Sequence, residues 1–146
     1  MIISHYMTTE HRDCDSLFST AESSVAAKNW AQAEEEFLAF SDKTLLHFKK
    51  EEEELFPTFE AKTGSADGPT KVMRFEHDQV RGLIGKMAEA IEKQDRDAYL
   101  SLAESTMILL QQHNMKEEQM LYAMCDRVFE PELKEATLGA LKEMTL

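Results

Sequence analysis

The stretch HFKKEEEELFP at residues 47–57 recurs in modified form as HNMKEEQMLY at residues 113–122. In both copies His, Lys, two Glu, Leu and an aromatic residue occupy the same places, at an offset of 66 residues. The same offset relates Glu10-His11 to Glu76-His77, so four of the five histidines form two matched pairs. The sequence therefore contains an internal repeat of two related halves.

The repeated motif has the spacing of a metal half-site. A histidine and a glutamate four residues apart lie on one helical face, so His47 and Glu51 can present a nitrogen and a carboxylate to one point. The same holds for His113 and Glu117. Imidazole and carboxylate together suit iron, manganese and zinc, whereas calcium takes oxygens alone and structural zinc usually brings cysteines. Because the half-site occurs twice, the sequence indicates two metals.

Length and composition narrow the class of protein. We expect residues 1–146 to form one domain, because this length buries a core without needing disulfides. A net charge of -12 argues against binding of nucleic acid or an anionic membrane and favours small-molecule partners. The absence of a basic leader and of a run of about 18 apolar residues predicts a cytoplasmic protein. Cys14 and Cys125 are far apart, which predicts reduced thiols.

Apolar periodicity predicts an all-α fold. Thr8 or Thr9 is expected to cap a first helix that ends near residue 27, and Pro57 to end or kink a second that starts at Trp30. Pro69 suits the first turn of a third helix, and Asp95 or Asp97 caps a fourth. We expect an up-down-up-down four-helix bundle over about residues 8–129, with a short fifth helix at about 131–144 that docks on the bundle or on another subunit. The inward face of the fourth helix is predicted to include Met120 and Met124.

Four histidines fall one on each helix of this bundle. They are His11, His47, His77 and His113. Burying carboxylates beside them costs several kcal/mol each unless cations compensate, so a metal pair explains the pattern best.

This order of residues resembles the hemerythrin-like cation-binding domain, over roughly residues 8 to 125. The resemblance implies a non-haem di-iron centre, oxo- or hydroxo-bridged, with two histidines on each iron and two bridging glutamates. The implied ligands are His11 and His47 on one iron, His77 and His113 on the other, and Glu51 and Glu117 between them.

The sequence departs from the oxygen-carrying hemerythrins at two places. Those proteins have a second histidine where Arg81 stands, and an aspartate where Glu118 stands. Glu117 is preferred as the ligand because it repeats Glu51. The resulting set of four histidines and two glutamates is similar to the di-iron domain of iron-sulfur cluster repair proteins.

These features lead to one functional hypothesis and two alternatives. The first is a di-iron protein that binds a diatomic ligand, O2 or NO, for sensing, storage or detoxification, and is a binder rather than a catalyst. The second is iron donation to damaged clusters, or reduction of peroxide or NO. The third is a structural metal-binding interaction module. The sequence leaves the oligomeric state open.

Residues around the motif have secondary roles in this interpretation. We expect Asp15 and Arg81 to form an ion pair over the site or to bond its histidines. Cys14 is either a small core residue, which is the favoured interpretation, or part of a ligand pocket with Val80 and Leu109. Glu52 and Glu118 are assigned to a solvated face, and Glu10 and Glu76 to helix N-termini. Whether Tyr6, Tyr122 or Glu118 adds a ligand stays open.

Overall fold

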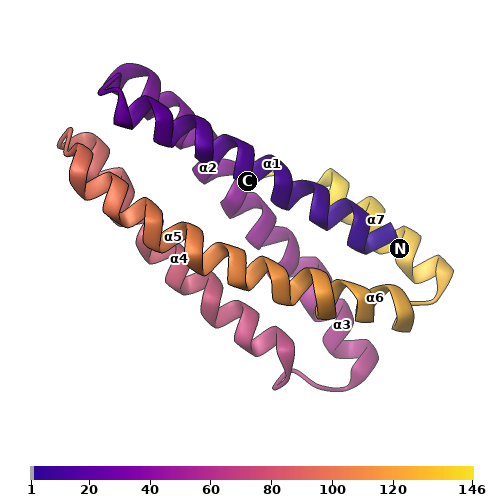
Figure 1. Cartoon of the computed structure of the whole chain (residues 1–146). Coiled ribbons are helices and arrows are strands. Elements are labelled where there is room, and N and C mark those ends of the chain that lie inside the picture. The colour runs from indigo at the N-terminus through magenta and orange to yellow at the C-terminus, as the bar shows by residue number, and fades with distance from the viewer. Residues whose placement is uncertain (1) are drawn as a thin grey trace.

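The computed structural model describes residues 2–146, and in this part of the chain all regular structure is helical, with no strand. Two long helical hairpins lie side by side, and a shorter helix packs against one of them (Figure 1). The elements in chain order are α1 (Ile2–Ala26), α2 (Trp30–Lys50), η1 (Glu51–Leu55), α3 (Phe56–Thr63), α4 (Pro69–Glu92), α5 (Arg96–Lys116), η2 (Glu117–Leu121), α6 (Tyr122–Val128) and α7 (Pro131–Glu143). The predicted all-α bundle with a short C-terminal helix is confirmed.

The repeat is visible in the turns as well as in the motif. Lys28 and Gln94, 66 residues apart, end α1 and α4 with left-handed backbone at φ 60° and 53°. After each, a backbone N–H donates to a carbonyl five residues earlier, at 2.9 and 2.8 Å. This bond satisfies a helix-end carbonyl. Each half of the repeat is therefore a hairpin closed by the same kind of turn.

The first helix begins earlier than predicted, at residue 2 rather than after Thr8 or Thr9. The N–H groups of Ile3 and Ser4 donate to the carboxylate of Asp126 at 2.9 and 3.0 Å. A distant residue therefore supplies the cap that the local sequence lacks, which periodicity cannot reveal.

The second helix does not end at Pro57 but continues as α3 to Thr63. The five residues before α3 form a π-helical turn, η1, and a second such turn, η2, interrupts the fourth helix at the matching position. Pro57 lies in the first turn of α3, where a missing N–H is tolerated. Gly64, at φ 74°, then ends the helix.

The wide turn at η2 also changes which residues face inward afterwards. Met120 is 58% exposed and Met124 is half-buried, contrary to the predicted stripe. Leu121, Tyr122 and Cys125 are buried in their place.

Two apolar clusters fill the bundle. One, around Phe18, Phe40 and Met87, lies toward the two matching turns. The other, around Leu55, Phe56 and Tyr122, includes Leu141 of α7, so the C-terminal helix docks on the bundle itself. The histidines and glutamates of the motif lie between these clusters.

Candidate metal centre

Glu51, the first residue of η1, reaches histidines from both halves of the repeat. Its Oε1 lies 3.0 Å from Nε2 of His77 on α4 and 3.5 Å from Nε2 of His47 on α2. All three side chains are buried, with at most 3% of their surface exposed.

Glu117, the first residue of η2, makes the equivalent contacts in the second half of the repeat. Its Oε1 lies 3.1 Å from Nε2 of His11 on α1 and 3.2 Å from Nε2 of His113 on α5. The six side chains thus form one cluster in which each glutamate lies between a histidine of one half and a histidine of the other.

Two subsets of this cluster have the compactness of metal sites. Ligand atoms of the first subset all lie within 4.8 Å of one another, and the same holds for the second. The subsets are Glu51, His77, His113 and Glu117, and His11, His47 and Glu117.

The donor atoms themselves show that a cation fits this place. Four of them make no hydrogen bond within the described chain, although each is fully shielded from solvent: Glu51 Oε1, Glu117 Oε2, His77 Nε2 and His113 Nε2. A buried polar atom without a partner costs about 1–3 kcal/mol. A metal bound by these atoms removes that cost for all four at once.

Each histidine is oriented by a carboxylate behind its ring. The Nδ1 atom lies 2.7 Å from Glu118 in His11 and 2.6 Å from Glu52 in His77. These bonds leave Nε2 free to face the cluster. Carboxylate–histidine pairs of this kind fix the tautomer and raise the basicity of metal-bound imidazole.

The other two histidines have the same support. Nδ1 lies 2.9 Å from Glu10 in His47 and 2.8 Å from Glu76 in His113. The assignment of these four glutamates to a solvated face and to helix N-termini is therefore wrong. The 66-residue offset was the signal that could have found them, because it pairs Glu10 with Glu76 and Glu52 with Glu118.

A comparison with protein-family models places residues 2–125 in the hemerythrin HHE cation-binding domain. The chain belongs to this family. Searches of curated proteins and of solved structures found no match. The chain is thus a metal-binding hemerythrin-like protein whose buried site offers histidine and glutamate ligands.

Charged groups stabilise the supporting carboxylates of the hemerythrin-like site. Lys50 lies 2.6 Å from Glu10, and Lys116 is hydrogen-bonded to Glu76 at the matching place. Burial opposes ionisation of Glu10, but His47 and Lys50 outweigh it and lower the pKa of that carboxyl.

Two arginines support the other pair of carboxylates. Arg12 lies 2.6 Å from Glu118, and Arg81 lies 2.8 Å from Glu52. Arg81 thus bonds the carboxylate that orients His77 and not the histidine itself, which differs from the predicted direct bond to a histidine. The other alternative, an ion pair with Asp15, is not formed, because Asp15 pairs with Arg12 at 3.5 Å.

Without a metal, protons compensate the buried carboxylates. Burial would lower the pKa of His11 and His77, but the adjacent carboxylates, the site glutamates together with Glu118 and Glu52, raise both to about 9. Burial and the adjacent Glu117 raise the pKa of Glu51. These shifts favour protonated groups in the metal-free site, so metal binding is expected to release protons.

Tyr122 enters the site because of the π turn. Its hydroxyl donates to Glu51 Oε2 at 2.7 Å and to Glu117 Oε1 at 2.9 Å. Tyr122 is five residues beyond Glu117, a spacing that faces another way in an α-helix but stacks on the same face across a π turn. The sequence alone does not show that a π turn precedes Tyr122, so it could not decide whether this hydroxyl reaches the site.

The other two candidates for an additional ligand are placed behind the site. Glu118 bonds Nδ1 of His11, on the side of the ring that faces away from the cluster. The hydroxyl of Tyr6 accepts a hydrogen bond from Lys50 at 2.7 Å. Lys50 in turn bonds Glu10, and Glu10 bonds His47, so two side chains lie between Tyr6 and this histidine.

The predicted pocket residues belong to the packing around the site. Val80 is fully buried in the first apolar cluster, and Leu109 packs against that cluster. Cys14 is buried on α1 near Thr44, and burial raises the pKa of its thiol to about 11. A thiol of this kind is not a nucleophile near neutral pH.

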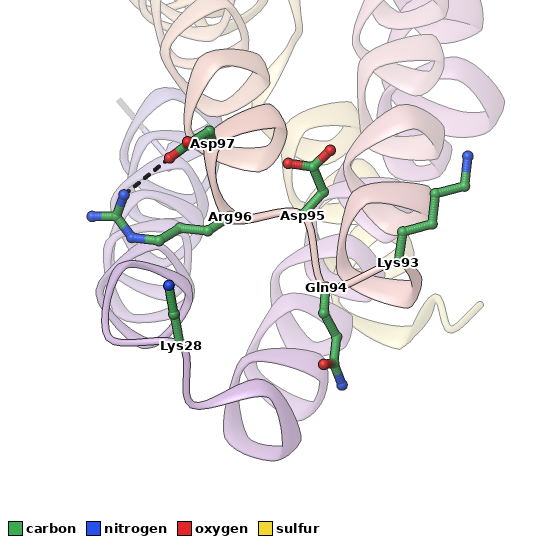
Figure 2. A pocket seen from close by; sticks show the side chains of 6 residues that line it. All are labelled: Lys28, Lys93, Gln94, Asp95, Arg96 and Asp97. Atoms are coloured by element: carbon green, nitrogen blue, oxygen red, sulfur yellow. Dashed lines mark hydrogen bonds and ion pairs between the residues drawn. The ribbon is translucent and has the colours of Figure 1, made fainter.

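A surface hollow of about 600 Å³ lies at the turns that close the two hairpins (Figure 2). Its lining consists of Lys28, Lys93, Gln94, Asp95, Arg96 and Asp97. These residues are some 16 positions along the helices from His11 and His77, or roughly 24 Å. The hollow is therefore separate from the candidate metal centre.

Proposed function

We propose that this protein is a non-haem di-iron protein that binds a diatomic ligand, O2 or NO. Six residues are proposed to hold the two ions. They are His11, His47, His77, His113, Glu51 and Glu117. A bound iron pair would supply a redox-active centre to which a diatomic molecule can attach.

The observation that carries this proposal is the surroundings of His77. Its ring stacks on Phe48, with centroids 3.9 Å apart, and on Phe56 at 5.7 Å. Among residues 2–146, two histidines and two glutamates form this half of the site, so these side chains supply fewer ligands than an octahedral metal takes. Beside these aromatic rings, a small apolar ligand suits an open metal position better than a charged or bulky one.

The four supporting carboxylates contribute to the same function. Each holds its imidazole with Nε2 directed at the cluster, so the site is organised before a metal arrives. We include the cytoplasmic location inferred from the sequence in this proposal.

Metal analysis with an anaerobic optical titration tests the proposal. We expect about two irons per chain, and a reversible spectral change when O2 or NO is added to the reduced protein. A protein purified and reconstituted with iron that holds fewer than two ions, or holds two that respond to neither gas, would contradict it.

Iron donation is a second candidate, favoured by one feature of the surface. A hollow of about 330 Å³ between α1 and α5 is lined by residues that include Arg12, Asn114 and Glu118. Glu118 bonds His11, so one side chain separates this hollow from the cluster. Rapid transfer of iron to an apo iron-sulfur acceptor, without reversible gas binding, would favour donation over ligand binding.

A further inference from the structure

The two halves of the site differ at one position above the glutamates. Phe56 follows η1 and Tyr122 follows η2, 66 residues apart, and both are fully buried. Phe56 stacks on His77 with an interplanar angle of 18°. Tyr122 instead directs a hydroxyl into the half formed by His11 and His47. The halves are therefore chemically unequal although the chain is a repeat.

The Tyr122 hydroxyl lies close to four nitrogen and oxygen atoms of the cluster, all of which can bind a metal. It lies 3.1 Å from His11 Nε2 and 3.2 Å from His47 Nε2. It lies 2.7 Å from Glu51 Oε2 and 2.9 Å from Glu117 Oε1.

These contacts exceed what a phenol can satisfy by hydrogen bonding. A histidine that donates Nδ1–H to a carboxylate binds a metal through the lone pair on Nε2, and in His11 and His47 this Nε2 atom faces the Tyr122 hydroxyl. The glutamate oxygens are acceptors as well. One phenolic proton cannot serve four acceptors, whereas one cation can be shared by all of them and by the phenol oxygen.

The same distances match the edges of a coordination polyhedron. Nitrogen and oxygen ligands bind first-row metals at about 2.1 Å, and adjacent ligands of an octahedral ion are then about 3.0 Å apart. The four contacts of the Tyr122 oxygen span 2.7 to 3.2 Å. An octahedral ligand has four such neighbours.

We propose that Tyr122 is a seventh protein ligand, on the metal held by His11 and His47, and that an added small molecule binds at the other metal. This inference rests on the proposed two-metal function and deepens it. The phenol oxygen bonds the metal as its proton leaves to solvent, with no change of oxidation state. With the oxo or hydroxo bridge that the resemblance implies, the metal at His11 and His47 would then have five protein donors and a full octahedral set. The metal at His77 and His113 would have four protein donors and one open position, on the half that contains Phe56.

The test uses the ferric protein loaded with iron and the variant Tyr122→Phe. We expect visible phenolate-to-iron(III) charge-transfer absorption in the native protein, with phenolate ring modes in its resonance Raman spectrum, and loss of both in Tyr122→Phe. Tyr99→Phe is the matched control, because Tyr99 is equally buried but belongs to the apolar cluster toward the turns. It is expected to keep both signals.

Titration of the reduced protein with NO tests the second half. We expect one NO per chain in the native protein, up to two in Tyr122→Phe, and loss of NO binding in Phe56→Tyr, which places a phenol on the open half. Circular dichroism and iron content establish that each variant is folded and loaded.

The outcomes separate this inference from the proposed function. Two irons per chain without a phenolate signature, or a signature that survives in Tyr122→Phe, overturn the ligand role of Tyr122 and leave the di-iron function intact. Binding of two NO per chain by the native protein overturns the assignment of the open metal. Failure to hold two irons overturns the proposed function itself.

Discussion

Replacing Glu10 by glutamine is expected to weaken metal binding and also to destabilise the metal-free protein. Glu10 accepts a bond from His47 at 2.9 Å and contacts Lys50 at 2.6 Å. Glutamine keeps the volume and an oxygen for the imidazole but removes the negative charge. Loss of an outer carboxylate of this kind typically costs ten- to a hundredfold in metal affinity, or about 1.4–2.8 kcal/mol.

The effect on the fold depends on the lysine rather than on the histidine. The Lys50 side chain is only 5% exposed, and Glu10→Gln leaves its charge buried without a carboxylate. Breaking a buried ion pair on one side costs about 3–5 kcal/mol. Because the Tyr6 hydroxyl keeps one hydrogen bond to Lys50, we expect the lower end, about 3 kcal/mol in the free energy of unfolding.

Glu76→Gln is the matched control that the repeat provides. Glu76 lies 2.8 Å from Nδ1 of His113, so the loss of metal affinity should be similar. Its lysine, Lys116, is 46% exposed, and water replaces the lost partner. The unfolding free energy should then fall by no more than about 1 kcal/mol.

Urea unfolding of the metal-free variants and competition with a chelator measure the two quantities separately. We expect similar metal affinities for Glu10→Gln and Glu76→Gln, with a difference of about 2 kcal/mol between their unfolding free energies. Equal destabilisation by both variants would refute the argument from Lys50 burial. Native metal affinity in both would refute the supporting role of the carboxylates.

Three further changes test other parts of the structure. Because the pKa of His11 and of His77 is raised from 6.5 to about 9, their protons stabilise the metal-free fold fully below pH 6.5, and this contribution is lost as the pH rises through about 9. Metal affinity should rise over the same interval, by up to about tenfold per pH unit for each proton displaced, which a metal titration with a pH indicator detects. Asp126→Ala should lower the unfolding free energy by about 0.5–2 kcal/mol through loss of the α1 cap, with iron content unchanged by metal analysis. Gly64→Ala should cost about 1–2 kcal/mol in thermal unfolding because of its positive φ of 74°, although nothing crowds the new methyl group.

The sequence predicted the six clustered residues because helical spacing is a local property. A histidine and a glutamate four apart share a face in any regular helix, and duplication supplied the second pair. The side-by-side hairpins that bring His11 and His77 to the same cluster follow from short connections between antiparallel helices. One histidine on each of four helices and two His-x-x-x-Glu motifs were therefore enough to predict which six side chains lie together.

The ion pairs of Asp15 and Arg81 could not be predicted from the sequence, because each of these side chains has more than one possible partner of opposite charge. Arg12 contacts Asp15 on α1 and Asp78 contacts Arg81 on α4, each pair three residues apart, in addition to the bonds of the two arginines to the supporting carboxylates. The order of charges is reversed between the two halves of the repeat. Asp15 and Arg81 occupy equivalent positions with opposite charge, which suggested a cross-bundle pair. Arg81 is instead engaged by Asp78 on its own helix and by Glu52, the carboxylate behind His77.

The π turns explain the remaining difference and connect it to function. An α-helix would carry Tyr122 about 500° past Glu117, or roughly 140° around the axis, so its hydroxyl could not share a face with that carboxylate. The wider turn removes this offset, and it occurs at both glutamates, which indicates that it belongs to the repeated unit. In the first half it brings Phe56 against His77, and in the second it brings a hydroxyl against His11 and His47. One backbone device thus gives an apolar wall on one side of the site and a polar contact on the other, so a single side-chain difference is sufficient to make a duplicated site asymmetric.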